Sequence, residues 1–164
     1  MQFRLFSRPK SLRQRWMFSN MSALTLIVTL AVASFCIAMA AYYYTTMGTG
    51  LDTRANQTAS LFRNYTEAEY YQWAQNYVST FTEQNSLELQ FLTPDGQVRL
   101  SSYGLTANSI PGTDDISSAV ANMMSDTWSG WDPHTGERIM AASAPVVYNG
   151  TVVGVVRLVT SRCV

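Results

Sequence analysis

Residues 144–161, APVVYNGTVVGVVRLVTS, contain two apolar runs that meet at Asn149 and Gly150. Asn-Gly is the preferred central pair of a two-residue type I′ turn, because both residues tolerate the positive φ angles that this turn requires. The stretch therefore predicts an antiparallel β-hairpin with two specific cross-strand pairs, Tyr148 with Thr151 and Pro145 with Gly154. Since proline has no N–H to donate, we expect the strand that carries Pro145 to be bulged there or hydrogen-bonded on one side only.

An earlier hairpin is predicted in residues 87–101, LELQFLTPDGQVRLS, where apolar and polar side chains alternate on both sides of Pro94-Asp95-Gly96. Gly96 can adopt the positive φ of a bulged turn. A further strand is expected near residues 128–131. Strands that are not regularly separated by helices are typical of the α+β class, so we expect an antiparallel sheet of about five strands with flanking helices.

Two of the flanking helices are predicted within the same part of the chain. Residues 66–81, TEAEYYQWAQNYVSTF, place six apolar side chains on one helical face, and Thr66 with Glu69 forms a capping-box pattern at its start. This aromatic stripe is interpreted as a core face, with a ligand pocket as the alternative. A short helix is expected to begin at Thr113 or Asp114, which are good N-terminal capping residues.

The most apolar segment lies near the N-terminus. Residues 23–44, ALTLIVTLAVASFCIAMAAYYY, carry no charge, and 22 residues at about 1.5 Å each suffice to cross a hydrocarbon core of roughly 30 Å. Five basic residues and no acidic residue occur in 1–15, which predicts a cytoplasmic N-terminus, and the three final tyrosines are typical of a membrane interface. We expect an uncleaved anchor; the alternative is a signal peptide cleaved near residues 38–40.

A helix is also predicted directly after this segment. Leu51, Ala55, Thr58 and Phe62 recur at steps of three and four residues, which predicts a helix over 45–63. The Gly48-Thr49-Gly50 stretch weakens its continuity with the segment before it, because glycine costs about 1 kcal/mol in a helix interior.

Charge and cysteine usage exclude several classes of protein. The formal net charge of the 164 residues is zero, but the part after residue 15 has six arginines against eleven carboxylates, so nucleic-acid binding by this part is not expected. The part of the chain after Tyr44, expected to lie outside the cytoplasm, is called the outer domain. Cys36 lies in the proposed span and Cys163 near residue 164, so the outer domain has no internal disulfide. The domain must be stabilised by packing alone.

The search for catalytic motifs gives only candidates for binding. His134 is the single histidine and Lys10 the single lysine, which excludes a multi-histidine zinc site and a P-loop in the outer domain. We predict no catalytic residue, metal site or cofactor. The motif WSGWDPHTGERIM is interpreted as a surface turn with a solvated histidine, and a small-ligand site is the alternative. Tyr103, Trp131 and Arg138 are the candidate ligand-binding residues, chosen by their chemistry.

Taken together, residues 4–161 resemble the first span and extracytoplasmic PAS-like (Cache-like) sensor domain of bacterial transmembrane sensor histidine kinases. The resemblance includes the hairpin LTPDGQVRLSS and is most specific in the last hairpin, within the terminal GERIMAASAPVVYNGTVVGVVRLVTS. It implies signal sensing at the bacterial cell membrane, a small ligand or envelope signal as partner, and homodimerisation through the helical segment from Leu51 to Phe62. The same domain also occurs in chemoreceptors and cyclases.

The expected organisation has five parts. They are a cytoplasmic basic N-terminus (1–15), a transmembrane helix (16–44), a juxtamembrane helix (45–63), a PAS-like sensor domain (64–161) and the start of a link to a second span (162–164). No phosphoacceptor helix or ATP-binding domain is present in the 164 residues. We therefore expect the chain to be the input region of a longer receptor; the alternative is a complete small membrane-anchored or secreted binding protein.

Overall fold

The computed structural model describes residues 12–82, 87–103 and 108–161, in two compact units, Met1–Tyr44 and Thr45–Val164. Helix α1 (Leu12–Leu61) is continuous through Gly48 and Gly50, so the predicted weakening there does not interrupt it. Among the described residues, α1 is the one helix long and apolar enough to cross a membrane. It fits either a membrane anchor or a signal sequence.

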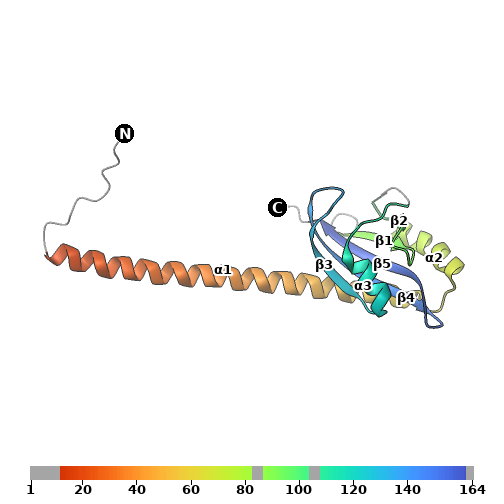
Figure 1. Cartoon of the computed structure of the whole chain (residues 1–164), viewed down its shortest axis with the longest axis horizontal. Helices are drawn as coiled ribbons and strands as arrows, with labels where there is room; N and C mark the ends of the chain where they lie inside the picture. The colour runs from red at the N-terminus through yellow and green to blue at the C-terminus, as the bar shows by residue number, and fades with distance from the viewer. Residues whose placement is uncertain (1–11, 83–86, 104–107, 162–164) are drawn as a thin grey trace. The chain divides into compact units, whose positions relative to one another are not determined.

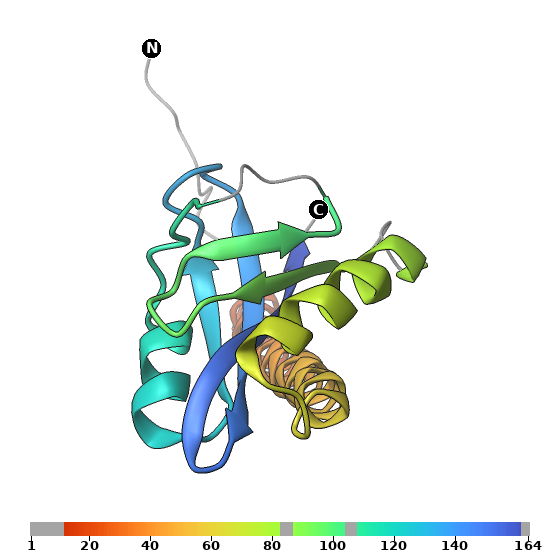
Figure 2. The same cartoon turned by 90° about the vertical axis from the view of Figure 1, so that its right-hand side faces the viewer.

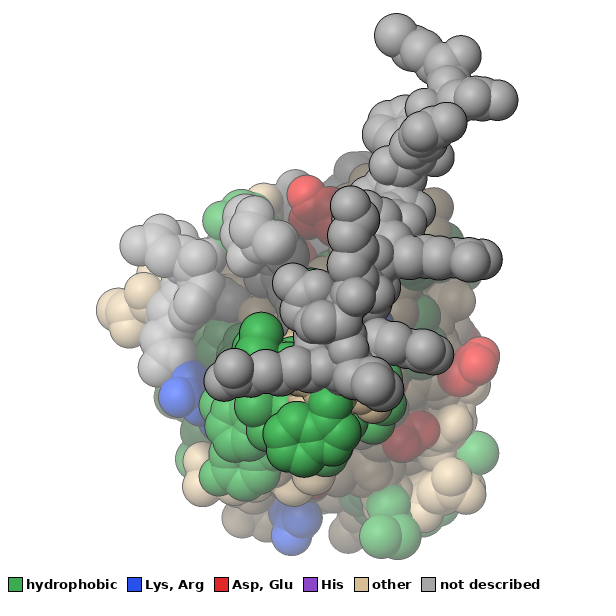
Figure 3. Space-filling view, turned by 90° about the vertical axis from the view of Figure 1, so that its left-hand side faces the viewer, with side chains coloured by type: hydrophobic (Ala, Val, Ile, Leu, Met, Phe, Trp, Pro, Cys, Tyr) green, Lys and Arg blue, Asp and Glu red, His purple; other side chains and the backbone are tan. Residues whose placement is uncertain are grey.

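Large apolar side chains on the first unit are exposed. From Trp16 to Tyr43, α1 presents them around its circumference, and apolar side chains gather on the face of the molecule that Figure 3 shows. An 18-residue window of α1 reaches a mean hydropathy of 2.4 and is not covered by any other part of the described structure. Such a surface requires an apolar environment, as a bilayer provides.

The second unit contains a five-stranded antiparallel sheet with flanking helices, which confirms the predicted α+β fold class (Figure 1). Its strands lie in the order β2-β1-β5-β4-β3. Their bounds are β1 Glu88–Leu92, β2 Val98–Ser101, β3 Asp126–Trp131, β4 Arg138–Tyr148 and β5 Thr151–Ser161. The helices after α1 are α2 (Glu67–Thr80) and α3 (Asp114–Asn122). The predicted turn at Gly96, with φ of 83°, and the helix start after Thr113 are both confirmed.

The β4–β5 hairpin confirms one predicted pair and corrects the other. Asn149 and Gly150 form the turn with φ of 49° and 78°, and Tyr148 faces Thr151. The predicted pairing of Pro145 with Gly154 is wrong. The register shifts between Val146 and Val147, so the pairs farther from the turn are displaced by one residue along β5. Pro145 faces Val155 instead. As expected, this proline is paired on one side only, since the β3 ladder ends at Ser143.

Helices α1 and α2 cover one face of the sheet, and α3 covers the other (Figure 2). The α1–α2 face carries the main hydrophobic core. It includes Leu51, Ala55 and Ala59 of α1 and Phe62, which directly follows α1; these residues of the segment predicted to mediate dimerisation are buried within the domain itself. On α2, Tyr70 and Ala74 are buried as predicted, whereas Trp73 is 51% exposed and lies outside the core.

The N-terminus of α2 gives a testable pH dependence. The Glu69 carboxylate accepts hydrogen bonds from the backbone N–H and the hydroxyl of Thr66, at 2.9 and 2.8 Å, and these bonds hold the pKa of Glu69 below its ordinary value. A carboxyl whose pKa is lower in the folded state stabilises the fold above its unfolded pKa and loses this effect as the pH falls through the folded value. We expect Glu69→Gln to lower the melting temperature at pH 7 and to have no effect near pH 3. Thermal unfolding at both pH values tests this; an equal shift at both would contradict it.

Candidate functional site

The α3 side of the sheet carries a polar row in its centre. Gln90 on β1 pairs with Arg157 on β5, and Arg157 pairs with Ser143 on β4. Directly opposite residues in an antiparallel ladder point to the same face, so these three side chains lie side by side. All three are buried. A polar row in this position is unusual, since sheet centres covered by a helix are normally apolar.

Arg157 makes three hydrogen bonds to buried partners. Its Nε donates to Oδ2 of Asp115 at 2.9 Å, Nη1 donates to Oε1 of Gln90 at 3.0 Å, and Nη2 donates to the Thr113 hydroxyl at 2.9 Å. The Arg157 and Asp115 side chains are 2% and 0% exposed, so water screens their attraction little. Two of the partners lie at the start of α3, and the arginine therefore ties this helix to the central strand.

The carboxylate of Asp115 is satisfied on one oxygen only. Oδ2 accepts from Arg157 and, at 2.6 Å, from the hydroxyl of Ser143. Oδ1 is buried and accepts no hydrogen bond from any residue in the described ranges. A buried acceptor without a donor costs about 1–3 kcal/mol. The site thus has an unused acceptor for a group that brings an N–H or O–H.

The polar row lies between two small apolar clusters and beneath a covering segment. One cluster is formed by Leu92, Val98, Ile116 and Val155, and the other by Ile139, Ala141 and Val159 with Trp128 packed against them. The covering segment begins at Asn108, whose N–H donates to the carbonyl of Val98, and passes Gly112, whose built Cβ position is 4.0 Å from Pro133. Apolar walls around a few converging polar groups are the usual composition of a small-molecule site.

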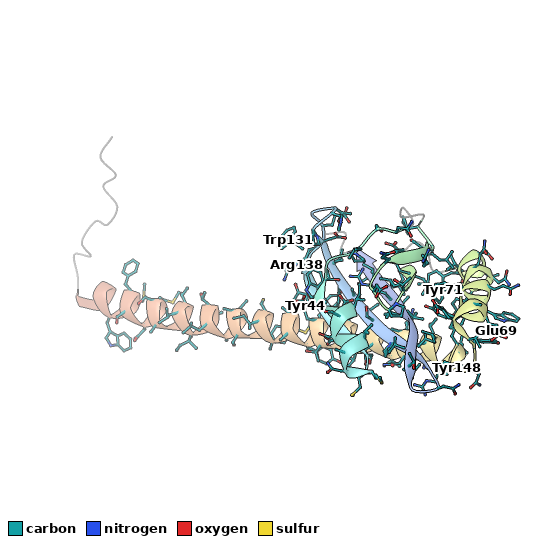
Figure 4. All side chains as sticks on the ribbon, turned by 45° about the vertical axis from the view of Figure 1, so that its right-hand side comes forward. Tyr44, Glu69, Tyr71, Trp131, Arg138 and Tyr148 are labelled. Carbon is teal, nitrogen blue, oxygen red and sulfur yellow. The ribbon has the colours of Figure 1, made fainter. Side chains whose placement is uncertain are left out.

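The predicted site residues are only partly brought together. Trp131 and Arg138 are cross-strand partners at the ends of β3 and β4, both exposed, and they lie at the opposite end of the sheet from Tyr148 (Figure 4). Tyr103 follows β2 at the other edge, so three strands separate it from Trp131. The structure therefore does not assemble these residues into one pocket, and their binding role stays a prediction.

The turn between Trp131 and Arg138 has the geometry of the predicted surface turn. Asp132 Oδ1 accepts from the backbone N–H of His134 at 2.7 Å, and the carbonyl of Asp132 accepts from the N–H of Gly136. His134 itself is exposed. These bonds are those of a self-contained surface turn.

Sequence reasoning missed the Arg157 cluster, although one signal was present. Arg157 is the only charged residue in 144–161 and shares a strand face with Val155 and Val159. An arginine in an apolar strand requires a buried partner. Its partner Asp115 directly follows the exposed Asp114 at a predicted helix start, where an acidic residue needs no buried partner to explain it.

Comparison with known proteins gives fold-level similarity. The sequence matches no protein-family model and no curated protein. Among similar solved structures are the sensor domain of the V. cholerae histidine kinase DctB (13% identity, TM-score 0.48, covering 80% of this chain and 55% of that one) and the ligand-binding domain of the Pseudomonas aeruginosa PAO1 amino acid chemoreceptor PctC in complex with GABA (20%, 0.43, 85% and 60%). A third is the ligand-binding domain of the Campylobacter jejuni chemoreceptor Tlp3 in complex with 4-methylisoleucine (14%, 0.38, 71% and 57%). The chain thus spans between 55% and 60% of these three domains.

Proposed function

We propose that this chain is the sensory input region of a bacterial membrane receptor of the two-component histidine kinase type. In this proposal α1 is an uncleaved anchor with a cytoplasmic N-terminus, and the domain after residue 44 is extracytoplasmic. A small ligand binds on the α3 side of the sheet. The observation that carries the proposal is the buried Asp115–Arg157 pair, which joins α3 to the central strand and leaves one carboxylate oxygen without a donor among the described residues.

The energetics of this pair favour a binding role over a purely stabilising one. Removing two charges from water is costly, and well-packed apolar side chains in the same place are often equally stabilising. A ligand that donates an N–H to Oδ1 of Asp115 satisfies an acceptor that is otherwise unpaired. We therefore propose a small ligand with an ammonium or amide group.

Strand β5 offers a direct route from this site to α1. Arg157 points to the α3 side, and its neighbour Val156 points to the opposite face, where it belongs to the same core cluster as Leu51 and Ala55 of α1. Successive side chains of a strand point to opposite faces, so a shift of β5 at Arg157 also moves the surface on which α1 packs. Ligand binding changes signalling only if it favours one of two such arrangements.

Ligand-dependent stabilisation of the full chain in detergent micelles tests the site. The probes are the proteinogenic amino acids, γ-aminobutyrate and simple alkylamines, each at millimolar concentration. A compound present at 100 times its dissociation constant should stabilise the fold by about 2.7 kcal/mol, which a thermal shift detects. We expect at least one such shift in the wild type, and its loss in Asp115→Asn.

The matched control is Asp114→Asn, which changes the neighbouring exposed carboxylate on the same helix. It should keep the full shift. A compound that stabilises Asp115→Asn as strongly as the wild type would place the site elsewhere, and the absence of a shift with every probe would contradict this ligand class.

The type of output is tested by the coding sequence after codon 164. About 20 apolar residues followed by a histidine kinase core would support the proposal. A chemoreceptor or cyclase domain in that place would keep the sensory function and change the output, and a stop codon would favour a complete small binding protein. Homodimerisation is part of the proposal, and it needs a surface other than the buried α1 residues; sedimentation in detergent measures it.

A further inference from the structure

We infer that the end of the sheet that carries Trp131 and Arg138 contacts the phospholipid headgroup layer. The inference rests on the membrane-anchor part of the proposed function. It concerns an interaction surface on the domain itself, distinct from the Asp115–Arg157 site.

This end of the sheet is the one where the chain enters the domain. The built Cβ position of Gly48, near the start of the second unit, is 3.9 Å from Sδ of Met140, which is two residues after Arg138. A cavity of about 260 Å³ beside it is lined by Thr46 and Met47 of α1 together with Leu87 and Thr160. Both sets of contacts place this sheet end beside the first residues of the second unit.

Chain length then limits how far this end can lie from the membrane. Gly48 is four residues beyond Tyr44, the last tyrosine of the proposed interface belt. Even fully extended, four residues span at most about 14 Å. This limit holds for any orientation of the domain relative to the anchor. The headgroup region extends several ångströms beyond the hydrocarbon core, so it covers part of this distance.

The two side chains have the chemistry of a headgroup contact. Trp131 is 69% exposed and lies opposite Arg138, which is also exposed. Tryptophan rings favour the membrane interface, and a guanidinium binds phosphate oxygens in a bidentate manner. Asp132 and Glu137 belong to the same turn, so the surface has no large positive charge. The contact should therefore form on zwitterionic as well as anionic lipids, through the ring and the phosphate rather than through net charge.

The four tryptophans of the chain make a direct experiment possible. Three variants each keep one tryptophan, Trp131, Trp16 or Trp73, and replace the other three by phenylalanine. Each full chain is reconstituted into phosphatidylcholine vesicles with lipids brominated near the headgroup, and emission is compared with vesicles of ordinary lipid. Trp16 is the first residue of the proposed transmembrane helix (16–44) and reports on the anchor; Trp73 lies on α2 and is the matched domain control.

We expect Trp16 and Trp131 to lose emission to brominated lipid to a similar degree, and Trp73 to be quenched only by aqueous iodide. Arg138→Gln should weaken the lipid quenching of Trp131, whereas Arg99→Gln, on the far edge strand β2, should not. Quenching of Trp16 alone would overturn the headgroup contact while leaving the anchor intact. If Trp16 is not quenched either, the anchor and this inference both fail.

Because Trp128 is partly buried against Ile139 and Val159, its replacement can loosen the domain. A second measurement avoids every substitution. The wild-type chain is labelled with 5-fluorotryptophan, and broadening of each ¹⁹F resonance by a gadolinium chelate on the lipid headgroup is recorded. The Trp131 resonance should broaden like that of Trp16; a Trp131 signal as sharp as that of Trp73 would contradict the contact.

Discussion

Replacing Asp115 by alanine should lower the free energy of unfolding by about 3–5 kcal/mol, because it leaves the buried guanidinium of Arg157 without its counter-charge. The variant also removes the acceptor of the Ser143 hydroxyl. Urea unfolding of the full chain measures the loss. Asp114→Ala is the control: this carboxylate is exposed at the start of α3, and its removal should cost less than about 1 kcal/mol.

A double variant of Asp115 and Arg157 shows whether the two charges contribute to the free energy of unfolding as a pair or independently. Arg157→Met alone should be as damaging as Asp115→Ala, since it leaves the carboxylate buried and unpaired. In the double variant Asp115→Leu with Arg157→Met, no buried charge remains, and apolar replacement of a buried pair is often neutral or stabilising. We expect the double variant to be more stable than either single one. Additive losses would mean that the two residues are not energetically coupled.

Those parts of the fold that depend on local sequence were predictable. The Asn149-Gly150 turn, the Thr66–Glu69 start of α2 and the Gly96 turn each rest on residues within a few positions of one another. Their backbone preferences act before any tertiary contact forms. Hydrophobic periodicity predicted the strands of the two hairpins and helix α2, because a strand or helix must present its apolar residues to one side.

The parts that were missed depend on contacts distant in sequence. Asp115 and Arg157 are 42 residues apart, and nothing near either residue identifies its partner. Trp73 has the spacing of a core residue but is exposed, because the packing angle of α2 decides which part of its apolar stripe is covered. Tyr103 and Trp131 were joined by chemistry alone, whereas the strand order β2-β1-β5-β4-β3 puts them at opposite edges.

The register shift in the last hairpin lies beside a contact between residues that are distant in sequence. The shift between Val146 and Val147 lies directly beside Gly154, which pairs with Val146. Gly154 in turn faces the ring of Tyr70, a residue of α2. The register shift thus occurs where the ring of Tyr70 contacts the backbone of β5. No short stretch of sequence shows this contact.

This contact leads to the second large effect: Gly154→Ala should destabilise the domain by about 3 kcal/mol, at the upper end of the usual cost of overpacking. A Cβ atom at this position would lie 2.3 Å from Cε1 and 2.6 Å from Cζ of Tyr70. No positive φ is involved, so the constraint is one of space. The ring has little room to move, because it is fully buried, packs edge to face against Phe62, and donates its hydroxyl to the carbonyl of Val155 at 3.2 Å.

Gly50→Ala is the matched control for this substitution, because it makes the same chemical change in the same domain. Apart from its chain neighbours and the backbone of its own helix, no atom of the described residues lies within 4 Å of the added Cβ. Gly50 is inside α1, so alanine should stabilise the fold by about 0.5–1 kcal/mol. The two variants should therefore shift the urea midpoint in opposite directions. In a Tyr70→Leu background the cost of Gly154→Ala should fall sharply, since the clashing ring atoms are gone. An unchanged cost would show that Tyr70 does not limit the space at β5, and that the strand backbone itself requires glycine there.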